Sequence, residues 1–476
     1  MPLILSGNVA SATAGGYEVA NSCRFDGDGD SLSREIDGVN TTKLTISLWF
    51  KVCQIDGTYG NILFSSENNG SDYLFIAQNT AGNLDINITG TANRRITNAT
   101  YRDPTAWYHL CVIFDSTQGS ATDRIKVYVN GTQVTSFSTE NNGMAEDSNL
   151  SPVDETVDYA IGTYHGQHAN WSIDGYMAEV VAIYGSALAP TSFGEFDEDS
   201  PTIWKPIDVS ELTFSGNSFY LDFEDSADLG ADVSGNSDDF TVNNLTSVDQ
   251  TTDTPTNNFA TMNVLAPANI DSASEGNLKI VQSSSGGSAI STMGFGSGKW
   301  YWEIEIDSQV TYTQLAGVIK ESQMEAALLT SFNVGANSGG WSYFLQSNTD
   351  NGKAFHNNSA SSVYTTVSDG DILSIAVDAD NGKIYFGVNG TWVNSGDPAA
   401  GSNEVYSGLP TDEIIFPAIT NYLGTGSGTP TMLMNFGNPP FSISSGNADA
   451  NGYGNFEYAV PSGYYALCTK NLAEYG

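Results

Sequence analysis

The chain has few basic residues: 16 Lys and Arg stand against 55 Asp and Glu among its 476 residues, a formal net charge of −39. A polyanion of this kind is repelled by nucleic acid and by anionic membrane surfaces. The acidic residues are spread along the chain instead of being gathered in one tail, which is typical of a solvated surface. We therefore expect no nucleic-acid partner.

Cysteine is also scarce. The four residues, Cys23, Cys53, Cys111 and Cys468, include no Cys-x-x-Cys pair, which excludes a zinc ribbon. A chain of this length can bury a core without disulfides, so we expect free and mostly buried thiols. Long apolar runs are missing too: no stretch approaches the roughly 20 apolar residues of a membrane span. Residues 1–14 lack the basic segment of a secretion signal. We therefore expect neither a membrane span nor a secretion signal.

Helical periodicity is nearly absent, and a period of two takes its place. Apolar side chains alternate along Thr45–Cys53, and Trp107–Phe114 is a second buried-strand candidate. Asn-Gly pairs at 130–131 and 389–390 supply the positive φ angles of tight hairpin turns. Only a few segments, such as Ala187–Phe196, look helical. Many short strands separated by turns predict an all-β fold with two jelly-roll-type antiparallel β-sandwich domains in series.

Composition also suggests domain boundaries. Residues 1–16 form an N-terminal arm, and residues 17–200 form the first sandwich. Residues 201–215 contain Pro201 and Pro206, which disfavour regular structure, and we assign them to a linker. The second sandwich then covers residues 216–476, with an Asp/Asn-rich opening loop and a C-terminal extension.

Both predicted sandwiches resemble known families. A laminin-G-like, concanavalin A-like domain over residues 17–200 is indicated by Arg24–Leu32, Thr45–Phe50, Trp107–Phe114, Lys126–Thr132 and Ile173–Tyr184. The segment Gly298–Ile306 (GKWYWEIEI) resembles the Tyr-Trp-Glu strand of SPRY domains, and that likeness covers about residues 260–440. SPRY domains bind partners through loops and are not enzymes, so the resemblance implies a non-enzymatic binding protein.

The order of these segments also resembles structural proteins of marine bacteriophages. Tyr17–Arg34, Asp222–Leu245 and Thr254–Ala266 carry that likeness. It implies a fibre, spike or decoration protein on the virion surface, which becomes extracellular after lysis. The implied partners are other capsid or tail proteins and a host-surface glycan, and a homotrimer is the favoured oligomer. Two alternatives stay open: a soluble calcium-dependent lectin and a polysaccharide-degrading enzyme.

One segment is rich in the oxygen ligands that calcium prefers. It contains an Asp-x-Ser-Gly-Asn turn, and its candidate ligands are Asp225, Asp228, Asp232, Asn236 and Asp238. The competing interpretation is an Asx-rich surface loop, whose side chains bond to their own backbone. The alternating Asp26, Asp28 and Asp30 likewise fit a tight turn better than an EF-hand.

Two further groups are candidates for function. Glu303, Glu305 and Asp307 share one face of a predicted strand, as the paired carboxylates of glycosidases do. The SPRY pattern places the same glutamates there without catalysis, so we assign no catalytic residue. Tyr164, His168 and Trp171 lie among Gly and Asn residues and could stack on a sugar of a host glycan; the alternative is packing at the rim of the sandwich.

Overall fold

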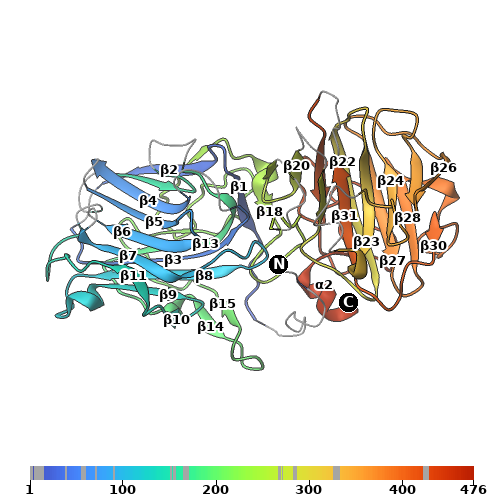
Figure 1. Cartoon of the computed structure of the whole chain (residues 1–476). Coiled ribbons are helices and arrows are strands. Elements are labelled where there is room, and N and C mark those ends of the chain that lie inside the picture. Colours follow the sequence, from blue (N-terminus) through green and yellow to red (C-terminus); the bar gives the residue numbers. More distant parts are fainter. Residues whose placement is uncertain are drawn as a thin grey trace. The chain divides into compact units, whose positions relative to one another are not determined.

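A computed structural model describes residues 4, 16–37, 40–54, 60–69, 72–88, 92–150, 153, 157–164, 171–265, 270, 272–281, 287–324, 333–421 and 428–476 (Figure 1). The chain divides into a first unit, Gly15–Thr256, and a second unit that joins Met1–Ala14 to Asn257–Gly476. Each unit contains two large, almost wholly antiparallel sheets. The predicted all-β fold with two sandwiches in series is therefore confirmed.

The first unit is built from two eight-stranded sheets. Sheet A has the order β10-β9-β8-β3-β13-β1-β18, with β16 paired to β13: β1 (Ser22–Asp26), β3 (Lys43–Val52), β8 (Tyr108–Asp115), β9 (Ile125–Val129), β10 (Thr132–Gln133), β13 (Asp174–Tyr184), β16 (Phe219–Leu221) and β18 (Gln250–Thr251). Sheet B has the order β11-β7-β6-β5-β4-β12-β2-β17: β2 (Ser31–Ile36), β4 (Asn61–Asn69), β5 (Asp72–Gln78), β6 (Asn83–Ile88), β7 (Arg94–Thr100), β11 (Phe137–Glu140), β12 (Val157–Ile161) and β17 (Thr241–Asn243).

The alternation along the strands places one continuous core between sheets A and B. Leu48 and Phe50 of β3 meet Leu74 and Ile76 of β5 in this core, and all four are fully buried. The turn between β9 and β10 has positive φ at Asn130 (47°) and at the following glycine (71°), as the Asn-Gly pair predicts. The predicted period-two alternation and the predicted Asn-Gly turn therefore both agree with the structure of the first unit.

The unit boundary differs from the predicted one. Residues 201–256, which we assigned to a linker and to the start of the second sandwich, lie in the first unit. Their strands β16, β17 and β18 pair with β13, β2 and β1. Lys51 of β3 also forms an ion pair of 2.7 Å with Asp253, and both side chains are buried. These pairings are far apart in sequence, so local composition could not show them.

The outer face of sheet A is covered by the chain that follows β13. This segment contains the two-stranded ribbon β14 (Gly194–Phe196) and β15 (Trp204–Pro206). Phe193, Val209 and Tyr220 pack there against Val181 and Ile183 of β13. Ala187–Phe196 was wrongly predicted to be helical, because only the single 3-10 turn η5 (Pro190–Ser192) forms before β14. We call residues 187–221 the first extension.

The second unit has a nine-stranded and a six-stranded sheet. Sheet C has the order β19-β20-β32-β22-β27-β28-β29, with β30 on β28 and β33 on β22: β19 (Ser272–Ser274), β20 (Lys279–Val281), β22 (Lys299–Ser308), β27 (Ile372–Asp378), β28 (Lys383–Val388), β29 (Thr391–Trp392), β30 (Tyr406–Ser407), β32 (Thr431–Asn435) and β33 (Tyr465–Ala466). Sheet D has the order β21-β31-β23-β24-β25-β26: β21 (Gly287–Ile290), β23 (Gln314–Lys320), β24 (Gly340–Phe344), β25 (Lys353–His356), β26 (Ser359–Val363) and β31 (Ile415–Asn421).

Helices are few among the described residues. They are one α-helix, α2 (Thr469–Tyr475), and the 3-10 turns η3 (Ala121–Arg124), η6 (Ser247–Asp249), η7 (Glu321–Gln323) and η8 (Val393–Ser395) besides η5. No helix in the described part of the chain is long and apolar enough to cross a membrane.

The end of the chain covers the outer face of sheet C. Phe456, Tyr464 and Cys468 pack there against Tyr301 of β22 and Tyr385 of β28. We call residues 437–468 the second extension. The two sandwiches thus share one design, in which the chain leaves the sandwich and returns over the outside of one sheet.

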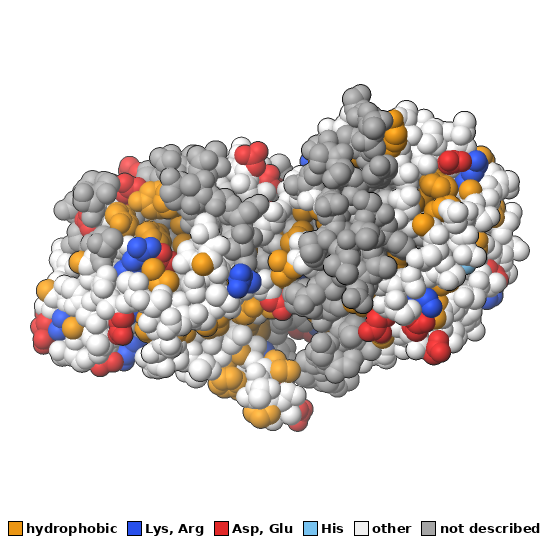
Figure 2. Space-filling model, viewed as in Figure 1, with side chains coloured by type: hydrophobic (Ala, Val, Ile, Leu, Met, Phe, Trp, Pro, Cys, Tyr) orange, Lys and Arg blue, Asp and Glu red, His pale blue; other side chains and the backbone are white. Residues whose placement is uncertain are grey.

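The N-terminal arm belongs to the second unit, whereas the cysteines are divided between the two units. Ile4, described within the predicted arm, forms a bridge with Met293, donating its N–H to the Thr292 carbonyl at 2.9 Å. All four cysteines are free and buried, as predicted. Burial raises the pKa of the Cys111 and Cys468 thiols, which makes them poor nucleophiles. Acidic side chains appear at several separate places on the face shown in Figure 2.

Candidate functional site

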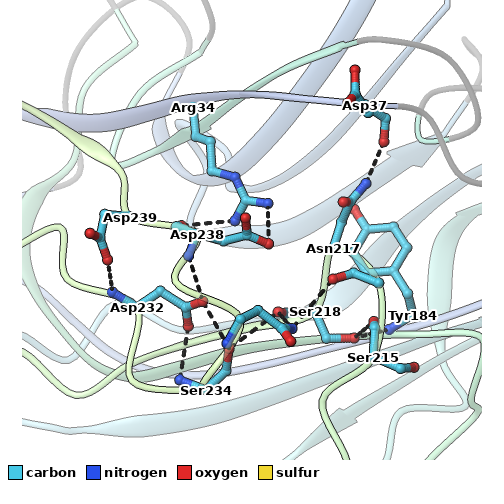
Figure 3. Close-up of polar contacts among 12 residues, drawn as sticks. Arg34, Asp37, Tyr184, Ser215, Asn217, Ser218, Asp232, Ser234, Asp238 and Asp239 are labelled. Carbon is cyan, nitrogen blue, oxygen red and sulfur yellow. Dashed lines mark hydrogen bonds and ion pairs between the residues drawn. The ribbon is translucent and has the colours of Figure 1, made fainter.

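The predicted calcium segment folds as a hydrogen-bonded turn (Figure 3). Asp232 Oδ1 accepts the N–H of Tyr220 at 2.9 Å and that of Ser234 at 3.0 Å. Asp232 Oδ2 accepts the Ser234 hydroxyl at 2.8 Å and the N–H of Asp238 at 3.2 Å. Four donors therefore occupy this carboxylate, which is 8% exposed.

The other predicted ligands have protein partners as well. Asp225 and Asp228 each accept an N–H two residues further along the chain. The Asn236 side chain donates to the Ser218 carbonyl at 2.7 Å. Asp238 pairs with Arg34 of β2 at 2.7 Å. The segment thus ties the first extension to sheet B.

This geometry does not fit a calcium site. Calcium needs six to eight oxygens converging on one point, whereas these oxygens serve separate turns. Within the described ranges there is no group of three or more His, Cys, Asp or Glu that could hold a metal ion. The Asx-rich loop interpretation agrees with the contacts. Asp26, Asp28 and Asp30 behave alike, because Asp26 accepts the Asp28 N–H at 2.7 Å in a turn between β1 and β2.

Strand β22 of the second unit carries the predicted acidic residues, and the first of them, Glu303, has a structural role. Glu303 is fully buried and accepts the Tyr301 hydroxyl at 2.7 Å. It also accepts the backbone N–H groups of Glu457 and Tyr458, at 2.9 and 2.8 Å. Burial raises its pKa, and these hydrogen bonds oppose that shift. Glu303 is sealed beneath the second extension and cannot reach a glycosidic bond, whereas Glu305 is partly exposed and Asp307 is exposed.

A buried serine and histidine also meet in the first unit, where the histidine lies against the first extension. His109 Nδ1 accepts the indole N–H of Trp204 at 3.0 Å, and Nε2 lies 2.8 Å from the Ser47 hydroxyl. Complete burial lowers the pKa of His109 to about 3, so its ring is neutral. Because Nδ1 is an acceptor, the ring proton lies on Nε2 and is donated to Ser47. The histidine therefore cannot act as a base toward this serine.

Two of the three predicted sugar-contact residues come together. The Tyr164 and Trp171 rings lie 5.1 Å apart between centroids, and both are partly exposed. His168 lies outside the described residues. Tyr73 of β5 meets Tyr164 edge-on at 6.4 Å and stacks on Phe75 at 5.9 Å, with an interplanar angle of 7°. We call Tyr73, Phe75, Tyr164 and Trp171 the aromatic cluster.

The aromatic cluster lies on the outer face of sheet B. Leu74 and Ile76 of β5 point into the core, so the alternate residues Tyr73 and Phe75 face outward. Sequence reasoning missed both, although the Tyr-x-Phe spacing within a strand was a usable signal. Tyr73 and Phe75 can be recognised as candidate binding residues only when the buried face of β5 is known.

Polar groups surround these rings on the same face. Phe75 is directly opposite Asn87 of β6, and Asn87 is opposite Arg94 of β7. Arg94 Nε donates to Asp85 Oδ1 at 2.8 Å, and this hydrogen bond raises the pKa of the guanidinium. The Tyr164 hydroxyl is bonded to the Glu67 carboxylate, and burial and this charge raise the pKa of the phenol. Ring faces with polar groups at their edges can bind an amphipathic ligand.

Comparisons with known proteins agree with this architecture. Residues 26–192 match the family model of the concanavalin A-like lectin/glucanases superfamily, and residues 299–430 match the model of the SPRY domain. No curated protein matches the chain.

Three solved structures illustrate the likeness. The chain is similar to the SPRY domain of human HERC1 (18% identity, 33% of this chain and 87% of that one, TM-score 0.26). It is similar to the TRIM65 PSpry domain (16% identity, 37% and 91%, TM-score 0.28). It is also similar to the heptameric SAP-like pentraxin from Limulus polyphemus (18% identity, 36% and 80%, TM-score 0.28). The family matches carry the assignment: this chain has a concanavalin A-like domain followed by a SPRY domain.

Proposed function

We propose that this chain is a non-enzymatic adhesion protein of a virus particle, and that its first domain binds host-surface glycans through the aromatic cluster. The two domain matches suggest a module that binds carbohydrate or protein. The observation that carries the glycan proposal is the meeting of Tyr73, Phe75, Tyr164 and Trp171 on the outer face of sheet B. Partly exposed rings of this kind offer flat apolar surfaces to the C–H faces of a sugar.

The particle setting rests on the resemblance to marine bacteriophage structural proteins. The strong negative charge and the free buried thiols are compatible with that setting. In it, other capsid or tail proteins hold the chain, a homotrimer is the expected oligomer, and calcium is the candidate cofactor. Among the described residues no ligand group fits calcium, so we propose adhesion without a required metal.

Glycan-array binding tests the adhesion proposal directly. Trp171→Ala and Tyr73→Ala each remove a ring from the cluster, and we expect affinity to fall about tenfold or more, as for central aromatic residues of other interfaces. Phe196→Ala is the matched control, because Phe196 is a 43% exposed aromatic residue of the same domain on β14. Equal binding by the wild type and both cluster variants would refute the aromatic cluster as the site.

Purified particles distinguish an adhesion protein of a virion from a soluble lectin. We expect the chain among the proteins of mature particles, and antibody labelling of its C-terminus should mark the particle surface. Its absence from mature particles, with glycan binding retained, would favour the lectin alternative.

A further inference from the structure

A row of carboxylates crosses sheet B beside the aromatic cluster. Glu35 of β2 is directly opposite Asp158 of β12, Asp158 is opposite Glu67 of β4, and Glu67 is opposite Tyr73. Residues directly opposite each other share one face of a sheet, so the three acids and the Tyr73 ring lie on the same outer surface. All three acids are at least partly exposed.

The three carboxylates of this row place negative charge on the outer face of sheet B. Like charges directly opposite each other on neighbouring strands destabilise a sheet. Arg94, the cation beside the rings, is already bonded to Asp85. The field at the cluster is therefore negative, and it extends about 8 Å into solvent at physiological ionic strength.

A buried acceptor accompanies the rings. Asn87 is 1% exposed, and its Oδ1 atom has no hydrogen-bond partner among the described residues. An unsatisfied buried carbonyl is costly, so such atoms call for a donor from water or from a ligand. Asn87 lies directly across from Phe75. Sugar hydroxyls are donors of the required kind.

We propose that this face of the first domain selects uncharged pyranose glycans and rejects sialylated, uronic or sulfated ones. The inference rests on the proposed function and adds the class of ligand. The ring faces pack against the C–H side of the sugar, and the carboxylates accept hydrogen bonds from its hydroxyl groups. An anionic substituent would lie within the negative field, and Arg94, the cation beside the rings, is already paired with Asp85.

The test uses the full chain and an array that carries the same oligosaccharides with and without terminal sialic acid or sulfate. We expect the uncharged form of each pair to bind at least about tenfold more tightly at low salt, with a smaller ratio at high salt because salt screens the repulsion. The double variant Glu35→Gln/Asp158→Asn should reduce that ratio several-fold. Glu198→Gln/Glu211→Gln is the control, since it removes two exposed charges from the same domain away from this face.

The outcomes separate the two proposals. Equal binding of both forms by the wild type would overturn the ligand class and leave glycan adhesion standing. An unchanged ratio in Glu35→Gln/Asp158→Asn would overturn the role of the carboxylate row. If the wild type retained no glycan at all, the proposed function and this inference would fail together.

Discussion

Each domain buries a glutamate beneath its extension, but different groups donate hydrogen bonds to the two carboxylates. In each, an extension returns over the outer face of one sheet and meets a buried glutamate on a central strand. Glu303 of β22 accepts two backbone N–H groups of the second extension, together with a tyrosine and an asparagine side chain. Glu179 of β13 accepts the Tyr220 hydroxyl at 2.8 Å and lies 3.4 Å from the Tyr17 hydroxyl. Backbone amides hold the first of these acids, and phenols hold the second.

Burial raises the pKa of both acids, and the donors around them oppose that rise to different extents. Burial, helped by the charges of Asp222 and Glu224, raises the pKa of Glu179 to about 8, although the hydrogen bonds from the two phenols oppose the shift. Asp208 adds negative charge near Tyr17. Glu179 also has a φ of 52°, at the point where the pairing of β13 with β3 shifts register. Fixed amide donors stabilise a buried charge, whereas phenols among other acids leave the protonated form favoured.

The largest effect is expected from removing the acceptor in the second domain. Glu303→Ala leaves its buried donors unsatisfied, and we expect a loss of about 3 kcal/mol or more in the free energy of unfolding of that domain. Chemical unfolding measures the loss, and limited proteolysis should cut residues 437–468 faster. Glu305→Ala on the same face is the control, because its carboxylate is less buried. An equal loss in both variants would contradict the anchoring role.

An intermediate effect is expected from Glu179, and it depends on pH. The folded domain keeps this proton to about pH 8, whereas an unfolded glutamate loses it near its ordinary value of 4.5. Since the folded state then binds more protons, stability falls as pH rises between these values. Glu179→Gln stays neutral and should flatten this fall, leaving the first domain about 3 kcal/mol more stable relative to wild type at pH 8 than at pH 5. Thermal unfolding from pH 5 to pH 8.5 checks it; parallel curves for the two proteins would show that Glu179 does not carry the dependence.

The smallest effect is expected at the second anchor of the first extension. Asp232→Ala removes four acceptor contacts at a less buried turn, and we expect a loss of about 1–2 kcal/mol from the first domain. A chelator should leave the melting temperature of the wild type unchanged, because the contacts around Asp232 are made by the protein itself. A melting temperature that falls with chelator and returns with calcium would restore the metal site to this segment.

Local patterns predicted much of the fold. The alternation in Thr45–Cys53 and the Asn-Gly turns depend on neighbours along the chain, and the structure reproduces them in β3 and in both hairpins. The helix-like Ala187–Phe196 failed because its apolar residues pack on sheet A instead of forming a helical stripe. The linker failed for a related reason: Asp253 finds Lys51 some 200 residues away.

The sequence identified only two of the four residues of the aromatic cluster. Tyr164 and Trp171 stood out as aromatic residues in a polar loop, but Tyr73 and Phe75 looked like any strand residues. Their exposure follows from the register of β5 between β4 and β6, which turns one side of the strand toward solvent.

The amino-acid sequence by itself determined that this protein is built from strands, is strongly acidic and keeps its cysteines reduced in the core, because periodicity, charge and turn chemistry are local properties. The tertiary structure alone decided where the first domain ends, which acids are sealed under the extensions and which rings meet beside a row of carboxylates. Those features come from contacts between distant segments, whose energies depend on burial and on directions that only the folded chain defines.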